Sequence, residues 1–259
     1  MRLVKSELQK LFTTRLWWIM LIVMLLLVVL QLVFLIAFAG QEQNGAPGIP
    51  ALDDPGWLPI AFSAASTGNI FTMILGVVMM TSEYRYQTIT GTLLVTPKRT
   101  LVIAAKLMSG VVVGLLFAVV ALVFVGIVAV IAVVAGGGTV SLTAHHLPQV
   151  ALGILIGLAL YTLFGIGLGA LVRNQIAALV GAIVWSYVIE SIFAAIPALQ
   201  PVGKWLPRGA YEALMDVEVN TGLGASNLLP VWGGALVLIG YGLAFALVAS
   251  LTTTRRDIT

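Results

Sequence analysis

Long uncharged stretches alternate with short charged segments along this chain of 259 residues. The four longest stretches without Asp, Glu, Lys or Arg lie between Arg15 and Glu42, Asp54 and Glu83, Lys106 and Arg173, and Glu218 and Arg255. An apolar run of about 20 residues crosses a hydrocarbon core of roughly 30 Å as a helix, because a helix satisfies its own backbone polar groups. The pattern therefore predicts membrane-spanning helices, and the third stretch is long enough for two of them.

The hydrophobic pattern places six spans, at about 16–39, 58–81, 107–135, 149–172, 176–196 and 229–251. The first is interpreted as retained rather than cleaved as a signal peptide, because polar residues follow it without a cleavage site of small residues. The spans form one transmembrane domain over 16–251, between an N-terminal segment, 1–15, and a tail, 252–259. The predicted fold class is an all-α membrane protein with six transmembrane helices.

Basic residues fall mainly on one side of this predicted topology. That side holds both termini and Arg2, Lys5, Lys10, Arg15, Arg85, Lys98, Arg99, Lys106, Arg173, Arg255 and Arg256, against Lys204 and Arg208 on the other. Because cytoplasmic segments hold the excess of Lys and Arg, we expect a multi-pass protein of the cell membrane with both termini in the cytoplasm. The net charge of +3 and the pI near 9.3 follow from this asymmetry and require no nucleic-acid partner.

The composition supports a membrane protein and argues against an enzyme. The chain is 60% hydrophobic and only 9% charged, with a mean hydropathy of +1.10, whereas soluble domains carry about 25% charged residues. It has no cysteine and no phosphate-binding GxxxxGK[ST] loop, since Trp205 follows Gly203-Lys204. The adjacent His145 and His146 lack a third ligand nearby. We therefore expect no metal site, no catalytic residue and no cofactor in this chain.

Residues 1–15 have the pattern of an amphipathic helix. Leu8, Leu11, Phe12 and Arg15 lie near one face, and Lys5 is turned away from it. Such a helix can lie along the cytoplasmic headgroup layer, where each basic residue contributes about 1 kcal/mol of attraction to anionic lipid. The segment is predicted to be an interfacial helix with membrane lipids as partners, although its charges also serve to enforce topology.

Residues 82–106 form the one substantial internal segment on the predicted cytoplasmic side. Its apolar and aromatic residues are too many for a solvated loop and too few for a span, which favours a short helix that seats in a groove of another protein. Charged residues can fix its register there by ion pairing: Glu83, Arg85, Lys98 and Arg99. The alternative is a basic flank packed on its own membrane domain.

The segment 197–228, on the predicted outer side, should contain a short helix. Pro207 suits the first turn of a helix that runs to about Val217. Its apolar residues, among them Tyr211, Leu214 and Met215, are expected to rest at the membrane interface.

Polar residues inside the predicted spans are candidates for a transport pathway. Glu190 lies near the outer interface, where it has either a structural role or contacts substrate as part of a gate. In the second span the polar residues are Ser63, Ser66, Thr67 and Asn69, the first three on one helical face. They either line a pathway or return hydrogen bonds to their own helix.

Glycine pairs at four-residue spacing mark close helix contacts. They are Gly110 and Gly114, Gly153 and Gly157, and Gly165 and Gly169. Each pair lies on one helix face and lets two backbones approach closely. We interpret the contacts mainly as packing within the chain, with a subunit interface as the alternative.

Two segments resemble the type-2 family of ABC exporter permeases. Lys5-Ser6-Glu7-Leu8-Gln9-Lys10-Leu11 with Thr13-Thr14-Arg15-Leu16-Trp17-Trp18 resembles the amphipathic elbow before the family's first span. Glu83-Tyr84-Arg85, Thr88-Ile89, Leu93-Leu94, Thr96-Pro97-Lys98-Arg99 and Ala105-Lys106 resemble the segment between its second and third spans.

The resemblance implies that residues 82–106 are a coupling helix that docks on a separate ABC ATPase subunit. The residues it assigns to this contact are Glu83, Tyr84, Arg85, Thr88, Ile89, Thr90, Leu93, Leu94, Pro97, Lys98 and Arg99. ATP and magnesium would then be bound by the partner. The resemblance also implies an assembly of two permease protomers and two ATPases.

The sequence thus predicts the permease subunit of an ATP-driven exporter, with the pathway between two protomers, either a homodimer or a pair with a similar paralogue. Hydrophobic drugs, lipids and peptides fit its apolar spans equally well. The alternative function is a non-transporting membrane anchor or assembly factor whose segment 82–106 tethers a cytoplasmic protein.

Overall fold

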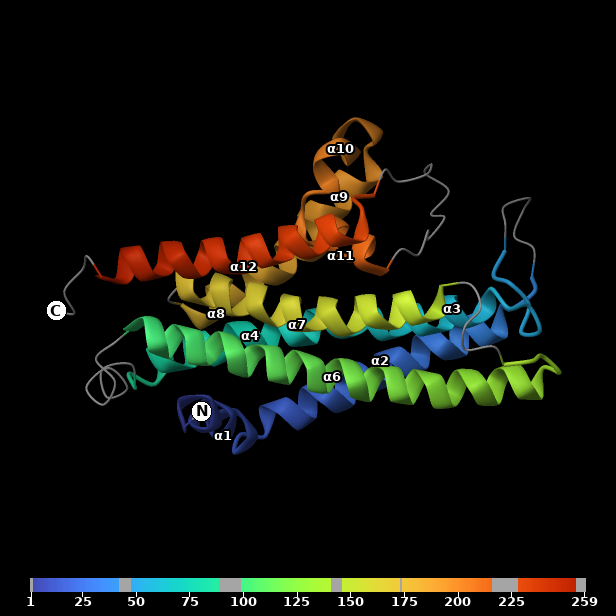
Figure 1. Ribbon diagram of the computed structural model, residues 1–259, viewed down its shortest axis with the longest axis horizontal. Coiled ribbons are helices and arrows are strands. Elements are labelled where there is room, and N and C mark those ends of the chain that lie inside the picture. Colours follow the sequence, from blue (N-terminus) through green and yellow to red (C-terminus); the bar gives the residue numbers. More distant parts are fainter. Residues whose placement is uncertain are drawn as a thin grey trace.

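The computed structural model describes residues 2–41, 48–88, 99–140, 146–172, 174–215 and 228–254. Within these ranges all regular structure is helical, which confirms the all-α class. Long helices run side by side along the bundle: α2 (Leu16–Ala37), α4 (Gly68–Arg85), α6 (Arg99–Ala135), α7 (Leu147–Leu171) and α12 (Val231–Thr254) (Figure 1). Several residues discussed above lie outside the described ranges: Ile89, Thr90, Leu93, Leu94, Pro97, Lys98, His145 and 216–227.

Two of the predicted spans contain turns that are not α-helical. The second consists of α3 (Trp57–Ser63), a 3₁₀ turn, η1 (Ala64–Thr67), and α4. The fifth consists of α8 (Gln175–Val184), a π-helical turn, η2 (Trp185–Ile189), and α9 (Glu190–Ala195). The chain then forms η3 (Pro197–Leu199), α10 (Gln200–Gly203) and α11 (Pro207–Met215) before it enters α12.

Five helical stretches of the described chain are long and apolar enough to cross a membrane: Leu16–Ala37, Trp57–Arg85, Leu101–Ala135, Leu147–Leu171 and Gln175–Ala195. They lie at the first five predicted spans. The sixth falls on α12, in which Val231–Phe245 is found as a shorter apolar helix among the described residues. The full count of six spans therefore stays a prediction.

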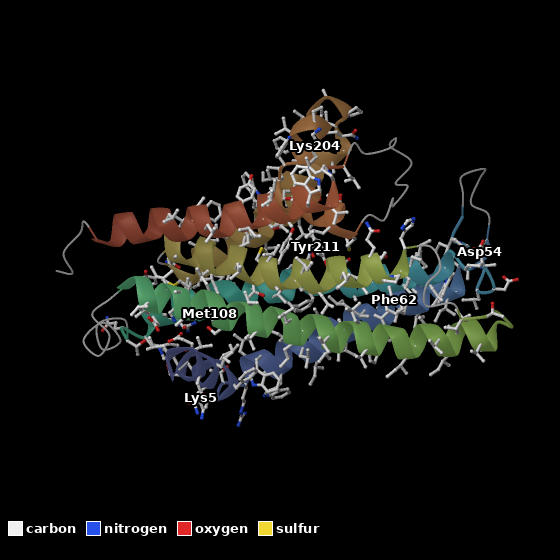
Figure 2. All side chains as sticks on the ribbon, in the orientation of Figure 1. Lys5, Asp54, Phe62, Met108, Lys204 and Tyr211 are labelled. Carbon is white, nitrogen blue, oxygen red and sulfur yellow. The ribbon has the colours of Figure 1, made fainter. Side chains whose placement is uncertain are left out.

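Helix α1 (Arg2–Phe12) crosses the direction of the long helices at one end of the bundle (Figure 1). Leu11 is buried, and Leu8 and Phe12 are partly buried. Lys5 and Arg15 are exposed, and Lys5 extends away from the bundle (Figure 2). The amphipathic pattern thus exists in the structure, with its apolar side turned toward the bundle. We call this end, where the last turn of α4 and the first turns of α6 also lie, the α1 end.

Helix α7 is the centre of the bundle, and α4, α6, α11 and α12 pack on it. Within its most apolar stretch 72% of the residues are buried, against 22% in α2. The outer helices therefore leave apolar side chains uncovered, as expected for surfaces that face lipid or a second protein. Examples on α2 are Leu26 and Leu30, which are 62% and 67% exposed.

Glycines set how closely these helices approach. Gly110 and Gly114 of α6 face α7, Gly165 and Gly169 of α7 face α4, and Gly153 and Gly157 of α7 face α11. A Cβ atom on Gly169 would lie 2.9 Å from the carbonyl oxygen of Val77, closer than real side chains approach. The interpretation of the three pairs as packing within the chain is confirmed.

Helix α11 begins at Pro207, as the sequence indicates, but its apolar residues pack inside the protein instead of facing lipid. Tyr211, Leu214 and Met215 are 2%, 1% and 6% exposed, because α11 packs against α7 and α12. That part of the prediction is wrong, because Gly153 and Gly157 have no side chains and let α11 pack closely on α7.

We predict that Gly165→Ala destabilises the protein, because the added Cβ would overlap the backbone of Met73 in α4. Overpacking of this kind costs about 1–3 kcal/mol. Gly181→Ala is the matched control, since Gly181 also lies in an apolar helix and has nothing within 4 Å of an added Cβ. The measurement is the free energy of unfolding in detergent micelles, and equal effects of the two substitutions would contradict the close contact.

Candidate functional sites

Four charged side chains meet where α1, α4 and α6 converge. The ammonium Nζ of Lys106 donates to Glu7 Oε2 at 2.6 Å and lies 2.9 Å from Glu83 Oε1. Lys10 Nζ lies 3.0 Å from the same Glu83 oxygen and also pairs with Glu7 Oε1. We call Glu7, Lys10, Glu83 and Lys106 the four-charge cluster.

The four-charge cluster is neutral as a whole, and three of its members are buried while Lys10 lies at its exposed edge. Glu7, Glu83 and Lys106 are only 6%, 4% and 1% exposed. Lys106 Nζ also donates to the Met79 carbonyl at 3.2 Å, so its hydrogen-bonding capacity is well used. Burial lowers the pKa of Lys10, but its hydrogen bonds to Glu7 and Glu83 outweigh this and raise the pKa above its usual value. Each charge is therefore held by its opposite, which is the condition for burying ions at tolerable cost.

The cluster changes the interpretation of the predicted coupling residues. The sequence predicts that Glu83 contacts another protein, whereas the structure pairs it with Lys106 and Lys10 of the same chain. The contacts of Glu83 therefore agree with the alternative hypothesis, in which this segment packs on its own membrane domain.

The neighbours of Glu83 lie differently. Arg85 and Thr88 are exposed and Tyr84 is partly buried. Arg85 Nη1 donates to Gln175 Oε1 at 3.3 Å, and its guanidinium lies 5.7 Å from the Tyr86 ring centre. Residues 82–88 therefore point one acid inward and one base outward. The side chain of Arg99 lies outside the described part of the structure.

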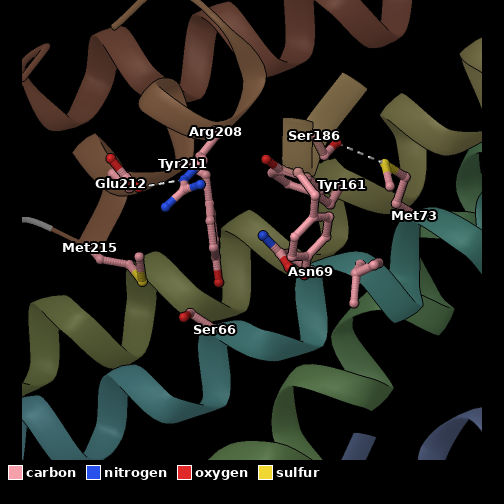
Figure 3. A pocket seen from close by; sticks show the side chains of 11 residues that line it. Ser66, Asn69, Met73, Tyr161, Ser186, Arg208, Tyr211, Glu212 and Met215 are labelled. Atoms are coloured by element: carbon pink, nitrogen blue, oxygen red, sulfur yellow. Dashed lines mark hydrogen bonds and ion pairs between the residues drawn. The ribbon is translucent and has the colours of Figure 1, made fainter. Parts of the chain in front are cut away.

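A second polar site is a cavity of about 200 Å³ between η1, α4, α7, η2 and α11 (Figure 3). The residues that line it are Ser66, Asn69, Ile70, Met73, Tyr161, Ser186, Tyr187, Arg208, Tyr211, Glu212 and Met215. We call this cavity the tyrosine pocket.

Of the predicted pathway residues in the second span, Ser66 and Asn69 line the tyrosine pocket, but Ser63 and Thr67 do not. Ser63 Oγ donates to the Ile60 carbonyl at 2.7 Å. Ser63 thus returns a hydrogen bond to its own helix, the alternative to a pathway role. Thr67 Oγ1 donates to Gln31 Oε1 of α2 at 2.8 Å. The shared α-helical face is lost because η1 is a 3₁₀ turn, with 3.0 rather than 3.6 residues per turn.

Glu190 is not among the residues that line the pocket. It is 3% exposed, and its Oε2 accepts a hydrogen bond of 2.6 Å from the backbone N–H of Arg208 at the start of α11. A carboxylate at a helix N-terminus satisfies a backbone donor that the helix itself leaves free. These contacts agree with the structural role, and place Glu190 as an anchor that holds α11 against the fifth span.

Most of the tyrosine pocket gives only a weak signal in the sequence. Tyr161 is the only tyrosine of α7, a weak signal among apolar neighbours. Ser186 and Tyr187 belong to the π-helical turn η2, which apolar periodicity does not reveal. The sequence predicts that Tyr211 rests at a membrane interface, whereas the structure places it in the pocket wall. Burial raises the pKa of Tyr211 well above its ordinary value, so its hydroxyl stays protonated.

We predict that Lys106→Met destabilises the protein by about 3–5 kcal/mol, because it leaves Glu83 and Glu7 with too little positive charge in a buried position. The double variant Lys106→Met/Glu83→Gln keeps the Glu7–Lys10 pair and should recover much of the loss. Lys5→Met, an exposed lysine on the same end, should change stability by less than about 0.5 kcal/mol. Unfolding free energies of the four proteins test this, and a harmless Lys106→Met would show that the ion pairs contribute little.

A comparison with known proteins identifies the family to which the chain belongs. The model described as "ABC-2 family transporter protein" matches residues 3–189, and no curated protein matches the chain. The matched region runs from α1 into the fifth span, so it contains the four-charge cluster and every wall of the tyrosine pocket except α11. Members of this family are transmembrane permease components and not themselves enzymes. Because the match covers well over half of the chain, this membrane-integral protein belongs to the ABC-2 family of transporters.

Proposed function

We propose that this chain is the permease subunit of an ATP-driven exporter, and that a separate ABC ATPase drives it. The observation that carries the proposal is the family match over residues 3–189. The sequence lacks a GxxxxGK[ST] loop, so the energy of ATP has to enter through a contact with another subunit. ATP and magnesium would be bound by that partner.

The four-charge cluster gives a physical route for this coupling. Glu83 and Lys106 lie at the two ends of segment 82–106, and their ion pair joins these ends at 2.9 Å. Glu7 and Lys10 tie the same point to α1. A movement of the segment caused by a partner would thus be transmitted to α4, α6 and α1 together, because the ion pairs link all three helices.

The proposed topology has six spans with both termini in the cytoplasm of a cell-membrane protein. It is supported by the excess of basic residues on the side of the termini. It is also supported by the arrangement in Figure 1, where α1 and the end of α12 lie at the same end of the bundle. Segment 82–106 then faces the cytoplasm, and α11 faces the opposite side.

We further propose that two permease protomers form the pathway between them, as a homodimer or as a pair with a similar paralogue. The bundle is filled around α7, which leaves little room for a wide pathway inside one protomer. The uncovered apolar surfaces of the outer helices supply area for a second protomer and for lipid. A non-transporting membrane anchor is the competing function, and it would share the ATPase contact but move no substrate.

We predict that Ile89→Asp prevents co-purification of an ABC ATPase with the tagged permease, because a charge placed in an apolar docking groove is left unpaired. The matched control Ile89→Val keeps an apolar side chain and should retain the ATPase. Arg85→Ala removes an exposed charge of the segment and should reduce the coupling between ATP hydrolysis and transport more than the binding itself.

The measurements are mass spectrometry of the purified complex, ATP hydrolysis and transport in vesicles. ATPase binding by Ile89→Asp at the level of Ile89→Val would show that segment 82–106 is not the docking element. A parent complex that hydrolyses ATP but moves no substrate would favour the anchor.

We predict that a cysteine at Lys5 is protected from an impermeant thiol reagent in intact cells, whereas a cysteine at Asp53 is labelled. Both positions are exposed. Figure 2 shows Lys5 and Asp54, the neighbour of Asp53, toward opposite ends of the bundle. The chain has no native cysteine to interfere. Permeabilised cells provide the control, since both cysteines should then react. Labelling of the Lys5→Cys variant in intact cells would reverse the proposed orientation.

A further inference from the structure

We propose that the tyrosine pocket binds a neutral group that carries hydroxyl or amide functions, about the size of one six-membered ring. Such a group would be the polar end of a larger, partly apolar ligand. The inference names a substrate class for the proposed transporter, and it rests on the proposed function only for its physiological meaning. Binding to the pocket requires neither ATP nor a partner.

Two buried hydroxyls point to a ligand. Tyr161 and Tyr211 are 1% and 2% exposed, and neither hydroxyl has a hydrogen-bond partner among the described residues. Both side chains line the cavity, and their rings pack edge to face with centres 5.2 Å apart. Figure 3 shows Tyr211 extending from α11 toward Ser66 across the pocket. Buried hydroxyls without partners are costly, so two at one cavity indicate that something else satisfies them.

The remaining polar groups of the wall match the same chemistry. Ser66 offers a hydroxyl and Asn69 an amide, and each can donate and accept. Ser186 donates to the sulfur of Met73 at 3.7 Å, a weak acceptor that a better one would replace. The π-helical turn η2 brings both Ser186 and Tyr187 to the wall, and turns of this kind occur frequently at functional sites.

The charges of the pocket argue against an ionic ligand. Arg208 and Glu212 are its charged lining residues, and they neutralise each other with Nε and Oε1 2.9 Å apart. Their side chains are 42% and 38% exposed, while the tyrosines are fully buried, so the ion pair lies toward the solvent. An anion among the tyrosines would be buried without a counter-ion, and a cation would have only Glu190, whose Oε2 already accepts the backbone N–H of Arg208. A hydroxyl or amide would gain partners without the penalty of burying a charge.

The volume limits the size of what enters. About 200 Å³ is below the range of roughly 300–1,000 Å³ typical of sites for drug-sized ligands. One ring or one short polar side chain fits, and the rest of the ligand has to lie outside. Ile70, Met73 and Met215 supply apolar contact for the carbon side of such a group.

The test uses the purified permease in lipid nanodiscs and three probes with the same alkyl chain: a glucoside, a trimethylammonium and a sulfate, each below its critical micelle concentration. Binding is measured against empty nanodiscs. We expect the neutral glucoside to bind more tightly than either charged probe. Tyr161→Phe and Tyr211→Phe should each weaken glucoside binding by about fivefold to tenfold, the effect of one hydrogen bond. Tyr86→Phe, an exposed tyrosine at the α1 end, should not change it.

The melting temperature without ligand distinguishes a binding role from a structural one. If the hydroxyls serve a ligand, both phenylalanine variants should melt at or above the parental temperature, because each removes a buried hydroxyl that lacks a partner. A lower melting temperature together with parental glucoside binding would overturn the proposal. Equal binding of all three probes, or no glucoside binding, would also overturn it and leave a cavity that holds water only. ATPase co-purification is independent, so its failure would refute the proposed function and not the pocket.

Discussion

The close approach of other helices to α7 is the constraint on which the rest of the structure depends. Where α4 meets α7, Gly76 and Gly165 let the two backbones touch, since a side chain on either would overlap the opposite main chain. The hydrophobic effect does not drive the association of helices within a membrane, so close packing has to stabilise the bundle. A second close contact places α11 on Gly153 and Gly157 of α7, and with it one wall of the tyrosine pocket.

The four-charge cluster restricts how α1, α4 and α6 can be placed relative to one another. Apolar contacts tolerate small shifts, but Lys106 has to reach Glu7 and Glu83 at once, at 2.6 and 2.9 Å. Buried ion pairs contribute little net stability against apolar replacements, yet breaking one is costly, so they define an arrangement more than they strengthen it. Here the arrangement joins α1 to both ends of segment 82–106, the place where a partner's movement would enter.

The tyrosine pocket lies where helical geometry is irregular. The 3₁₀ turn η1 and the π-helical turn η2 border it, and Glu190 holds the start of α11 beside it through the backbone of Arg208. Departures from α-helical geometry redirect side chains that a regular helix would point elsewhere. Polar groups inside an otherwise apolar bundle are thereby gathered from four separate parts of the chain at one site.

The sequence by itself determined the features that depend on local pattern. Apolar runs set the helices, Pro207 marks the start of α11, glycine spacing marks the close contacts, and the segment around Glu83 resembles the family to which the match over 3–189 assigns the chain. Only the tertiary structure decided which faces meet. Lys106 and Glu7 are 99 residues apart in sequence, and Tyr161 meets Tyr211 only because α11 seats on glycines of α7. Hydropathy reports the environment of each residue but not its neighbour, because that choice is made by packing between distant helices.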